Sequence, residues 1–396
     1  MALKDTLSVI AMAGQVAATV ALERVGPGPR LDRPGVVPPN AEAITAAWLT
    51  RALASDVAGA EVTAIEITGG SDGTSSRRAL SIEWNAAGTA AGLPTRLFSK
   101  AAAGLFSRLL LGLTDIAEGE SLFYNHARPT LELRSPRAHY AGFDPRTRRS
   151  LVLLEDLSTT GWTFPDPQSN PVTRTDAEDM VDQLAAYHSG LWDSPRFLRD
   201  LSGLKGAARW QEDLDGRVGF RSRTLRGFDR AAEVLPAGIL ARRADVYPSF
   251  HRALSLHEQG PQTLLHQDLH LGNWLRDADG RMGLYDWQCV ARGNWALDYS
   301  YAMAGALEPA DRREWEEGLL RRYLEQLADA GVAPPSYDAA WLAYRQQPMH
   351  AFAFGLFTLG GTRFEPELQP RAYTLAAIGR IAQFVDDHGT LATLED

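Results

Sequence analysis

The chain has 396 residues, of which 45% are hydrophobic and 22% are charged. A chain of this length and composition can bury two hydrophobic cores, so we expect two lobes and no compositional tendency to disorder. Its formal net charge of −9, from 40 basic and 49 acidic side chains, excludes a general nucleic-acid binder, because no basic excess is present to neutralise phosphates. A nucleotide needs only a few local donors and is not excluded.

The most apolar long stretch near the N-terminus runs from Leu7 to Leu22. It is shorter than the ~20 residues of a membrane-spanning helix, and the charges of Lys4 and Asp5 before it cancel, unlike the positive start of a secretory signal peptide. We expect a helix that packs on the domain or on a partner, with a signal peptide as the minor alternative, and then a linker rich in Pro and Gly.

The single cysteine, Cys289, cannot form an internal disulfide, so the expected location is cytoplasmic.

Two predicted strands flank a glycine-rich segment. Residues 62–67 and 80–84 alternate apolar and polar side chains, which predicts neighbouring strands. The run between them, Gly69 to Ser76, is rich in glycine, which lacks the Cβ that would keep backbone N–H groups away from a phosphate chain. We therefore expect a loop that binds nucleotide phosphates, and an ordinary hairpin turn is the alternative. The expected contacts are Gly70, Ser71, Gly73 and Thr74.

A third predicted strand, residues 96–100, ends in Lys100. This is the only lysine between residues 5 and 204, in a chain that otherwise uses arginine. A compact ammonium at a strand end suits the α- and β-phosphates of a nucleotide, and a surface lysine is the alternative. A helix follows whose carboxylates could pair with Lys100 and hold it in place. Glu120 is the expected partner, and Glu118 stays open as the other choice.

Residues 150–157 form a continuous apolar run ending in acids, which predicts a buried strand that leads into a connector. We expect backbone groups at Glu155 and Leu157 to meet the adenine edge, although a core strand that simply ends would explain these residues equally well. Beyond Ser158 the pattern becomes helical. The expected organisation is an N-terminal helix and linker over 1–37, a nucleotide-binding lobe over 38–157, and a helical lobe with the catalytic loop and substrate site over 158–396.

The most informative stretch is a polar cluster between apolar flanks, followed by a hairpin signal and a second apolar run. It has the form H-x-D-x-x-x-x-N, with His266, Asp268 and Asn273, and Asp286 follows on the next expected strand. Phosphoryl transfer requires that an acceptor hydroxyl is positioned and that spreading charge is neutralised. Asp268 would orient the acceptor and take its proton. Asn273 and Asp286 would offer oxygen ligands to magnesium.

His266 joins Asp268 in this catalytic loop and is expected to brace it through hydrogen bonds. A metal pair formed by His266 and His270 on a helix is the competing interpretation, but Gly272 and the hairpin signal after it favour a loop. A polar surface loop would leave the apolar runs on both sides unexplained. The pattern therefore favours an active site.

Three segments resemble the aminoglycoside phosphotransferase and choline kinase superfamily. They are Leu265-His266-Gln267-Asp268-Leu269-His270-Leu271-Gly272-Asn273, Tyr285-Asp286-Trp287-Gln288 and Asn294-Trp295-Ala296-Leu297-Asp298. The Asp-Trp-Gln of the second segment and Glu-x-x-Phe-Tyr at Glu120 to Tyr124 are most similar to the ecdysteroid kinase-like branch. The resemblance covers the chain from about Pro38 to the C-terminus, and its motifs are specific for the superfamily but do not select a substrate.

The resemblance implies an α+β, two-lobed, protein-kinase-like fold, with a small antiparallel-sheet N-lobe and a mainly helical C-lobe. It also implies ATP and Mg²⁺ as cofactors and Asp298 as the anchor of the catalytic segment. The chain departs from the protein kinases, because Trp287 and Gln288 follow Asp286 in place of Phe-Gly, and no Ala-Pro-Glu motif or long activation segment appears. A small-molecule hydroxyl is therefore the better acceptor.

We expect an ATP- and Mg²⁺-dependent small-molecule kinase. A nucleotide-binding pseudokinase or scaffold is disfavoured because the catalytic set is complete, and a protein kinase is disfavoured by the missing activation segment. The aromatic cluster from Trp341 to Phe357 contains few acids, which favours a metabolite or antibiotic more apolar than a polycationic aminoglycoside. We expect no nucleic-acid partner and no membrane span. A homodimer and the choice between ATP and GTP stay open.

Overall fold

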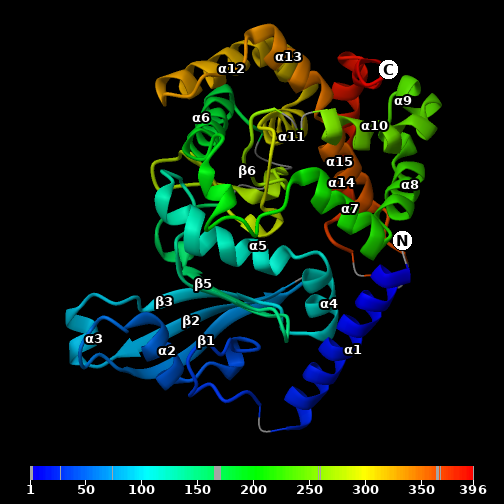
Figure 1. The fold of residues 1–396 in the computed structure, drawn as a ribbon. Coiled ribbons are helices and arrows are strands. Elements are labelled where there is room, and N and C mark those ends of the chain that lie inside the picture. Colours follow the sequence, from blue (N-terminus) through cyan, green and yellow to red (C-terminus); the bar gives the residue numbers. More distant parts are fainter. Residues whose placement is uncertain are drawn as a thin grey trace. The chain divides into compact units, whose positions relative to one another are not determined.

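The computed structural model describes residues 3–26, 28–73, 75–164, 171–256, 258, 260–362, 365 and 367–395. The chain divides into two compact units (Figure 1). The first unit comprises residues 1–129 and 136–161, and the second comprises residues 130–135 and 162–396. The division at 161/162 lies slightly beyond the boundary expected at 157/158, because a short turn at Leu157–Thr159, capped by Asp156, stays with the sheet.

The first unit is built on a five-stranded antiparallel sheet of order β1-β2-β3-β5-β4. Its strands are β1 (Val62–Asp72), β2 (Ser76–Trp84), β3 (Arg96–Ala101), β4 (Ala138–Asp144) and β5 (Arg149–Glu155). Its helices are α1 (Leu3–Val25), α2 (Ala46–Leu53), α3 (Ala86–Ala90), α4 (Leu105–Leu113) and α5 (Ile116–Leu122). One face of the sheet packs against α2 in a core that includes Trp48, Leu80, Leu97 and Leu151. Helix α5 lies on the other face (Figure 1).

Helix α1 is anchored within the first unit. Arg108 of α4 and Arg149 of β5 donate to the Glu23 carboxylate, through Nη1 at 3.0 Å and Nε at 2.7 Å. Burial alone would raise the pKa of Glu23, but the two guanidinium groups outweigh it and hold the pKa below its usual value. Val16 and Val20 are buried on the same helix. The helix therefore packs on its own unit, as one of the alternatives expected.

The glycine-rich segment corrects one expectation, because most of it is strand and not loop. Residues Gly70 and Ser71 pair with Arg78 and Arg77 in the ladder between β1 and β2. Glycine is required at position 70, where a Cβ would lie 2.3 Å from the Arg77 carbonyl oxygen. The Arg78 guanidinium crosses this region and donates to Asp72 at 3.0 Å. The hairpin therefore continues almost to its tip, where Gly73 lies, and Thr74 falls outside the described residues.

The second unit is mainly helical. Its helices are α6 (Arg174–Gly190), α7 (Ala207–Val218), α8 (Phe220–Arg230), α9 (Ala237–Ala241), α10 (Arg243–Leu256), α11 (Ala296–Ala306), α12 (Pro309–Asp329), α13 (Tyr337–Gln346), α14 (Met349–Leu359), α15 (Arg371–Asp387) and α16 (Thr390–Thr393). Two short antiparallel pairs join β6 (Thr263–Leu265) to β9 (Ala291–Gly293) and β7 (Trp274–Arg276) to β8 (Met282–Leu284). The predicted α+β class, with a small antiparallel sheet and a mainly helical second part, is confirmed. No helix among the described residues is long and apolar enough to cross a membrane.

Helices α8 and α14 cross with their backbones in close contact. A Cβ at Gly227 would lie 1.8 Å from the Leu356 carbonyl oxygen. Arginines of α8 also donate to the last carbonyls of α14: Arg223 to Phe357 at 2.8 Å, Arg226 to Gly360 at 3.1 Å and Arg230 to Leu359 at 2.8 Å. The carbonyls at a helix C-terminus have no partners within the helix, so these bonds satisfy groups that would otherwise need water. Helix α14 is thereby fixed along its axis.

Candidate active site

The catalytic segment follows β6 and is held by a buried carboxylate on α11. Asp298 is fully buried and accepts the backbone N–H groups of His266 at 2.6 Å and Gln267 at 2.9 Å. Burial alone would raise the pKa of Asp298, but contacts with His188 and Tyr187 outweigh it, and the pKa lies below its usual value. The anionic carboxylate can therefore hold Gln267 in a left-handed conformation, φ 63°, that a side chain other than glycine rarely adopts.

His266 links the catalytic segment to the residue before Asp286. Its Nε2 lies 2.9 Å from the Tyr285 carbonyl oxygen, and its Nδ1 accepts the Asp268 backbone N–H at 3.3 Å. A carbonyl can only accept, so these partners place the proton of a neutral imidazole on Nε2. The ring is fully buried and packs against Trp287. These contacts are of the bracing kind expected for His266.

Asn273 fixes one side of the Asp268 carboxylate. Its Nδ2 donates to the Asp268 carbonyl oxygen at 2.8 Å and to Asp268 Oδ2 at 3.2 Å. Since the amide nitrogen is used in this way, the amide oxygen is the atom left for a cation. The Asn273 carbonyl accepts the Tyr285 N–H at 3.1 Å, which brings Asn273 close to the residue beside Asp286.

Asp286 departs from the expected position on a strand. Strand β8 ends at Leu284, and Asp286 lies two residues further on with φ 63°, in the left-handed region. The bonds that hold both backbone sides of Tyr285, from His266 and Asn273, turn the chain out of the strand at this point. Asp286 and Asn273 supply hard oxygen donors, and Mg²⁺ is commonly held by one or two such side chains together with substrate phosphates. The donor chemistry therefore fits Mg²⁺.

In the first unit, Lys100 forms a buried ion pair with Glu120. The Nζ to Oε1 distance is 2.8 Å, and the side chains are 7% and 8% exposed. Side chains alternate along β3, so Lys100 lies on the face opposite Leu97 and Ala101, which pack in the core with α2. Helix α5 carries Glu120 to that face. Of the two glutamates left open, Glu120 is the partner of Lys100.

The other nucleotide candidates lie along the same sheet. Ser76 pairs with Ala101 and Glu155 pairs with Leu97, so the hairpin tip and Lys100 lie at one end of β3 and Glu155 at the other. Three residues of strand span about 10 Å, a spacing on the scale of a nucleotide. Glu155 also accepts the Arg137 N–H at 3.0 Å, and Leu157 begins the short turn after β5. Gly70 and Ser71 are strand residues, as described above.

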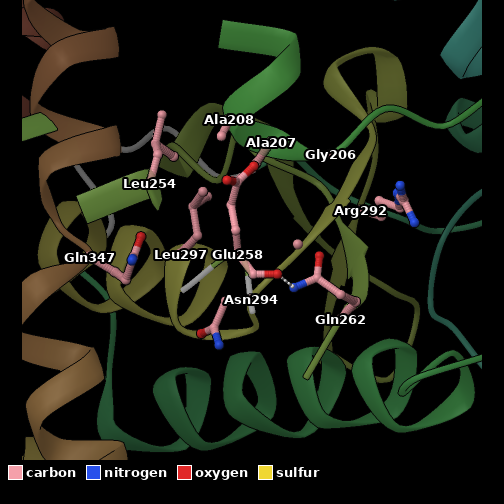
Figure 2. Close-up of a pocket in the computed structure, with 11 residues that line it drawn as sticks. Gly206, Ala207, Ala208, Leu254, Glu258, Gln262, Arg292, Asn294, Leu297 and Gln347 are labelled. Carbon is pink, nitrogen blue, oxygen red and sulfur yellow. Dashed lines mark hydrogen bonds between the residues drawn. The ribbon is translucent and has the colours of Figure 1, made fainter. Parts of the chain in front are cut away.

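Two cavities of the second unit are candidates for an acceptor site. The larger, about 160 Å³, lies among the start of α7, Leu254, Glu258, Asn294 and Gln347 (Figure 2). Neither Asp268, Asn273 nor Asp286 is among its lining residues. The smaller, about 40 Å³, contains Asp268 in its lining and is called the acceptor pocket below.

Half of the twelve residues that line the acceptor pocket are small or apolar, and they come from α11, α14 and α15. These are Gly305, Ala351, Phe354, Gly355, Ala377 and Ile381. Its other polar lining residues are His270, Tyr301, Thr358, Gln369 and Thr374, and Asp268 is the only carboxylate that the described residues bring to the lining. His270 is held there by the Gly272 N–H, which donates to its Nδ1 at 3.0 Å, and the side-chain amide of Gln369 lies beside its Nε2.

Comparison with known families decides the class of the protein. The sequence model of the phosphotransferase enzyme family matches residues 123–329, which is 207 of the 396 residues and more than half of the chain. The chain belongs to this phosphotransferase family. The superfamily predicted from the motifs is thereby confirmed, as is the enzyme class, a phosphotransferase with an alcohol group as acceptor. The ecdysteroid kinase-like branch stays a prediction.

Solved structures similar to this phosphotransferase include choline kinase LicA from Streptococcus pneumoniae, with 15% identity, a TM-score of 0.45 and coverage of 86% of this chain and 98% of that one. An aminoglycoside 2'-phosphotransferase in its GDP complex has 13% identity, a TM-score of 0.46 and coverage of 86% and 95%. An ethanolamine kinase from Plasmodium vivax has 12% identity, a TM-score of 0.43 and coverage of 82% and 81%. A search of curated proteins found no match.

Several residues that hold the catalytic segment could not be predicted from the sequence. Tyr187 donates to Asp298 Oδ2 at 2.6 Å, and His350 Nε2 donates to the Gln267 carbonyl at 2.9 Å. The Tyr301 hydroxyl lies 3.4 Å from Asp268 Oδ1. Of these, only Tyr301 could have been found from the sequence, because it lies three residues after Asp298 and so shares its helix face.

Proposed function

We propose that this phosphotransferase is an ATP- and Mg²⁺-dependent kinase that transfers the γ-phosphate to a hydroxyl of a small, fairly apolar metabolite or antibiotic. The observation that carries the proposal is the setting of Asp268. Its carboxylate is oriented by Asn273 and borders a pocket in which it is the only carboxylate among the described residues. A carboxylate so placed can align an acceptor hydroxyl and receive its proton.

In the proposed reaction, the acceptor oxygen gives its proton to Asp268 and forms a bond to the γ-phosphorus. The bond between that phosphorus and the β,γ-bridging oxygen breaks, and ADP leaves. Asn273 Oδ1 and Asp286 would hold Mg²⁺, which supplies neutralisation of phosphate charge when it is bound. Lys100 would contact the α- and β-phosphates, with Glu120 fixing its position. His266 braces the catalytic loop.

The remaining nucleotide contacts are proposed on the first unit. Backbone groups at Glu155 and Leu157 would meet the adenine edge. Gly73 would bring a backbone N–H close to a phosphate at the hairpin tip, and Gly70 and Ser71 would act from the strand beside it. The register of the sheet supports this division, because the tip and Lys100 lie at the same end of β3.

The acceptor class is proposed from the lining of the acceptor pocket. A polycationic acceptor would need several carboxylates to replace its lost hydration, and the described part of the chain brings one carboxylate, Asp268, to this pocket. Its volume of about 40 Å³ is well below the ~150 Å³ of a cavity that admits benzene. Only the end of the acceptor that carries the hydroxyl would therefore enter the pocket as it stands.

The test is Mg²⁺-dependent ADP release over a panel of hydroxylated metabolites and antibiotics, with choline and kanamycin as cationic acceptors. Asp268→Asn should lower kcat by about 10²–10⁴-fold while nucleotide binding survives, because general-base assistance is lost. Asp279→Asn, at an exposed aspartate in the hairpin turn, is the matched control. Undiminished turnover in Asp268→Asn would exclude this base.

Two other outcomes would select the rival functions. Nucleotide binding without turnover on any acceptor would favour a pseudokinase or scaffold. Useful turnover on aminoglycosides alone would contradict the apolar acceptor while leaving the kinase intact.

A further inference from the structure

One face of α11 touches the catalytic segment at two points. Asp298 binds the backbone of residues 266 and 267, as described above. Tyr301 stands three residues later, close to one turn of the helix, and its hydroxyl lies 3.4 Å from Asp268 Oδ1. The same helix therefore contacts both the backbone of the catalytic segment and the side chain of the candidate base.

The Tyr301 hydroxyl is a donor in this contact. The side chain is 5% exposed, and Asp268 is its one hydrogen-bond acceptor within the described part of the chain. Burial first, and then the negative charge of Asp268, raise the pKa of Tyr301 well above its usual value. A phenol that keeps its proton beside a carboxylate can only donate that proton to it.

The two oxygens of Asp268 are held from different sides. Oδ2 accepts Asn273 Nδ2 at 3.2 Å and lies 3.8 Å from His270 Nε2, whereas Oδ1 accepts Tyr301. Two fixed donors on different oxygens define the plane of a carboxylate, which a single donor would leave free to rotate. Each oxygen keeps acceptor capacity, so a hydroxyl in the acceptor pocket can still reach the group.

The Tyr301 ring is itself fixed by the structure around the loop. It contacts the His350 ring with centroids 6.0 Å apart, and His350 Nε2 donates to the Gln267 carbonyl at 2.9 Å. The Tyr301 hydroxyl is thus set relative to the loop by covalent attachment to α11 and by packing on a residue bound to the loop. Such a donor needs little reorganisation during the reaction.

We infer that Tyr301 is a positioning residue of this phosphotransferase, which orients the Asp268 carboxylate toward the acceptor hydroxyl. The inference rests on the proposed function. Tyr301 keeps its own proton throughout, and the proton of the acceptor goes to Asp268. In this role Tyr301 should affect the chemical step for every acceptor and should not affect the binding of ATP.

The chain offers a closely matched control. Tyr299 lies on the same helix, is fully buried, and its hydroxyl has no hydrogen-bond partner among the described residues. Tyr299→Phe and Tyr301→Phe therefore remove the same atom from the same helix, but only the second removes a bond to Asp268.

The experiment compares kcat, both KM values and thermal unfolding of the full chain for the two variants. Tyr301→Phe should lower kcat by about 10-fold, the lower end for a lost hydrogen bond to a charged group because this one is long. The KM for ATP should not change, and Tyr299→Phe should retain wild-type kcat. A kcat for Tyr301→Phe within about twofold of that for Tyr299→Phe, or a change confined to the acceptor KM, would overturn the inference.

A double-mutant cycle tests the route through Asp268. If Tyr301 acts by orienting Asp268, Tyr301→Phe should cause no further loss of residual turnover in the Asp268→Asn background, because the oriented group is already gone. Independent effects that multiply would refute the positioning role but leave the kinase function standing. Absence of Mg²⁺-dependent turnover in the wild type would refute both.

Discussion

His350 gives the molecule a sensitivity to mild acid. It is 2% exposed, and burial lowers its pKa from 6.5 to about 4, against a smaller opposing contribution from its bond to the Gln267 carbonyl. The unfolded chain takes up a proton on this residue below pH 6.5, whereas the folded protein does not until about pH 4. Its contribution to stability is therefore fully present above pH 6.5 and is lost as the pH falls toward 4.

The size of this effect follows from the shift in pKa. Each pH unit in the interval costs about 1.4 kcal/mol, so the whole interval amounts to about 3 kcal/mol. Between pH 7 and pH 5 the expected loss is about 2 kcal/mol, because only the part below 6.5 contributes. His350→Gln removes the titrating group and keeps an amide that can donate to the Gln267 carbonyl.

The measurement is the free energy of unfolding in urea at pH 7, 6 and 5 for the wild type and His350→Gln. Other titrating groups are present in both proteins and cancel in the difference. That difference should shrink by about 2 kcal/mol from pH 7 to pH 5. The exposed His126→Gln is the control for losing a histidine at the surface. A difference between wild type and His350→Gln that stays constant over this range would refute the reasoning.

Two further changes test the packing around the candidate site. Glu120→Gln leaves the buried Lys100 without its carboxylate partner. The free energy of unfolding should therefore fall by about 3 kcal/mol, and the KM for ATP should rise. An unchanged stability and an unchanged KM would show that Glu120 has no role in the candidate site. Gly227→Ala forces a methyl group against the Leu356 carbonyl and should lower the free energy of unfolding by at least about 1–3 kcal/mol. At Gly216 a Cβ would meet nothing within 4 Å, so Gly216→Ala should raise the free energy of unfolding by about 0.5–1 kcal/mol. Equal melting temperatures for these two variants would contradict the close crossing.

The catalytic loop could be predicted from sequence because its members are close along the chain. Asp268 and Asn273 are five residues apart, and their hydrogen bond forms within one loop. The pairing of Lys100 with Glu120 could be narrowed to two glutamates, but only the direction in which α5 faces selects one. Long-range contacts such as that of His350 with Gln267 could not be predicted from a sequence pattern. An apolar helix with one histidine is equally typical of a helix that only packs in the core.

The expectations that failed are places where tertiary contacts override local preference. A run containing Gly69 and Gly70 favours a turn, yet the ladder with β2 and the side chain of Arg78 keep it extended. Asp286 follows an apolar run that predicts continued strand, yet hydrogen bonds on both sides of Tyr285 divert the backbone. In both places the residues that determine the backbone conformation lie outside the short sequence pattern from which the conformation was predicted.

The crossing of α8 and α14 bears on how acceptor preference could be redesigned. The arginines of α8 donate hydrogen bonds to the terminal carbonyls of α14. A shift of α14 along its axis would therefore leave those carbonyls without hydrogen-bond partners. The wall that α14 contributes to the acceptor pocket is thus a rigid scaffold, and the shape of the pocket depends on side-chain size at positions such as Ala351 and Gly355. A combinatorial library at these positions and at Gly305 and Ala377 would vary the pocket on an unchanged backbone.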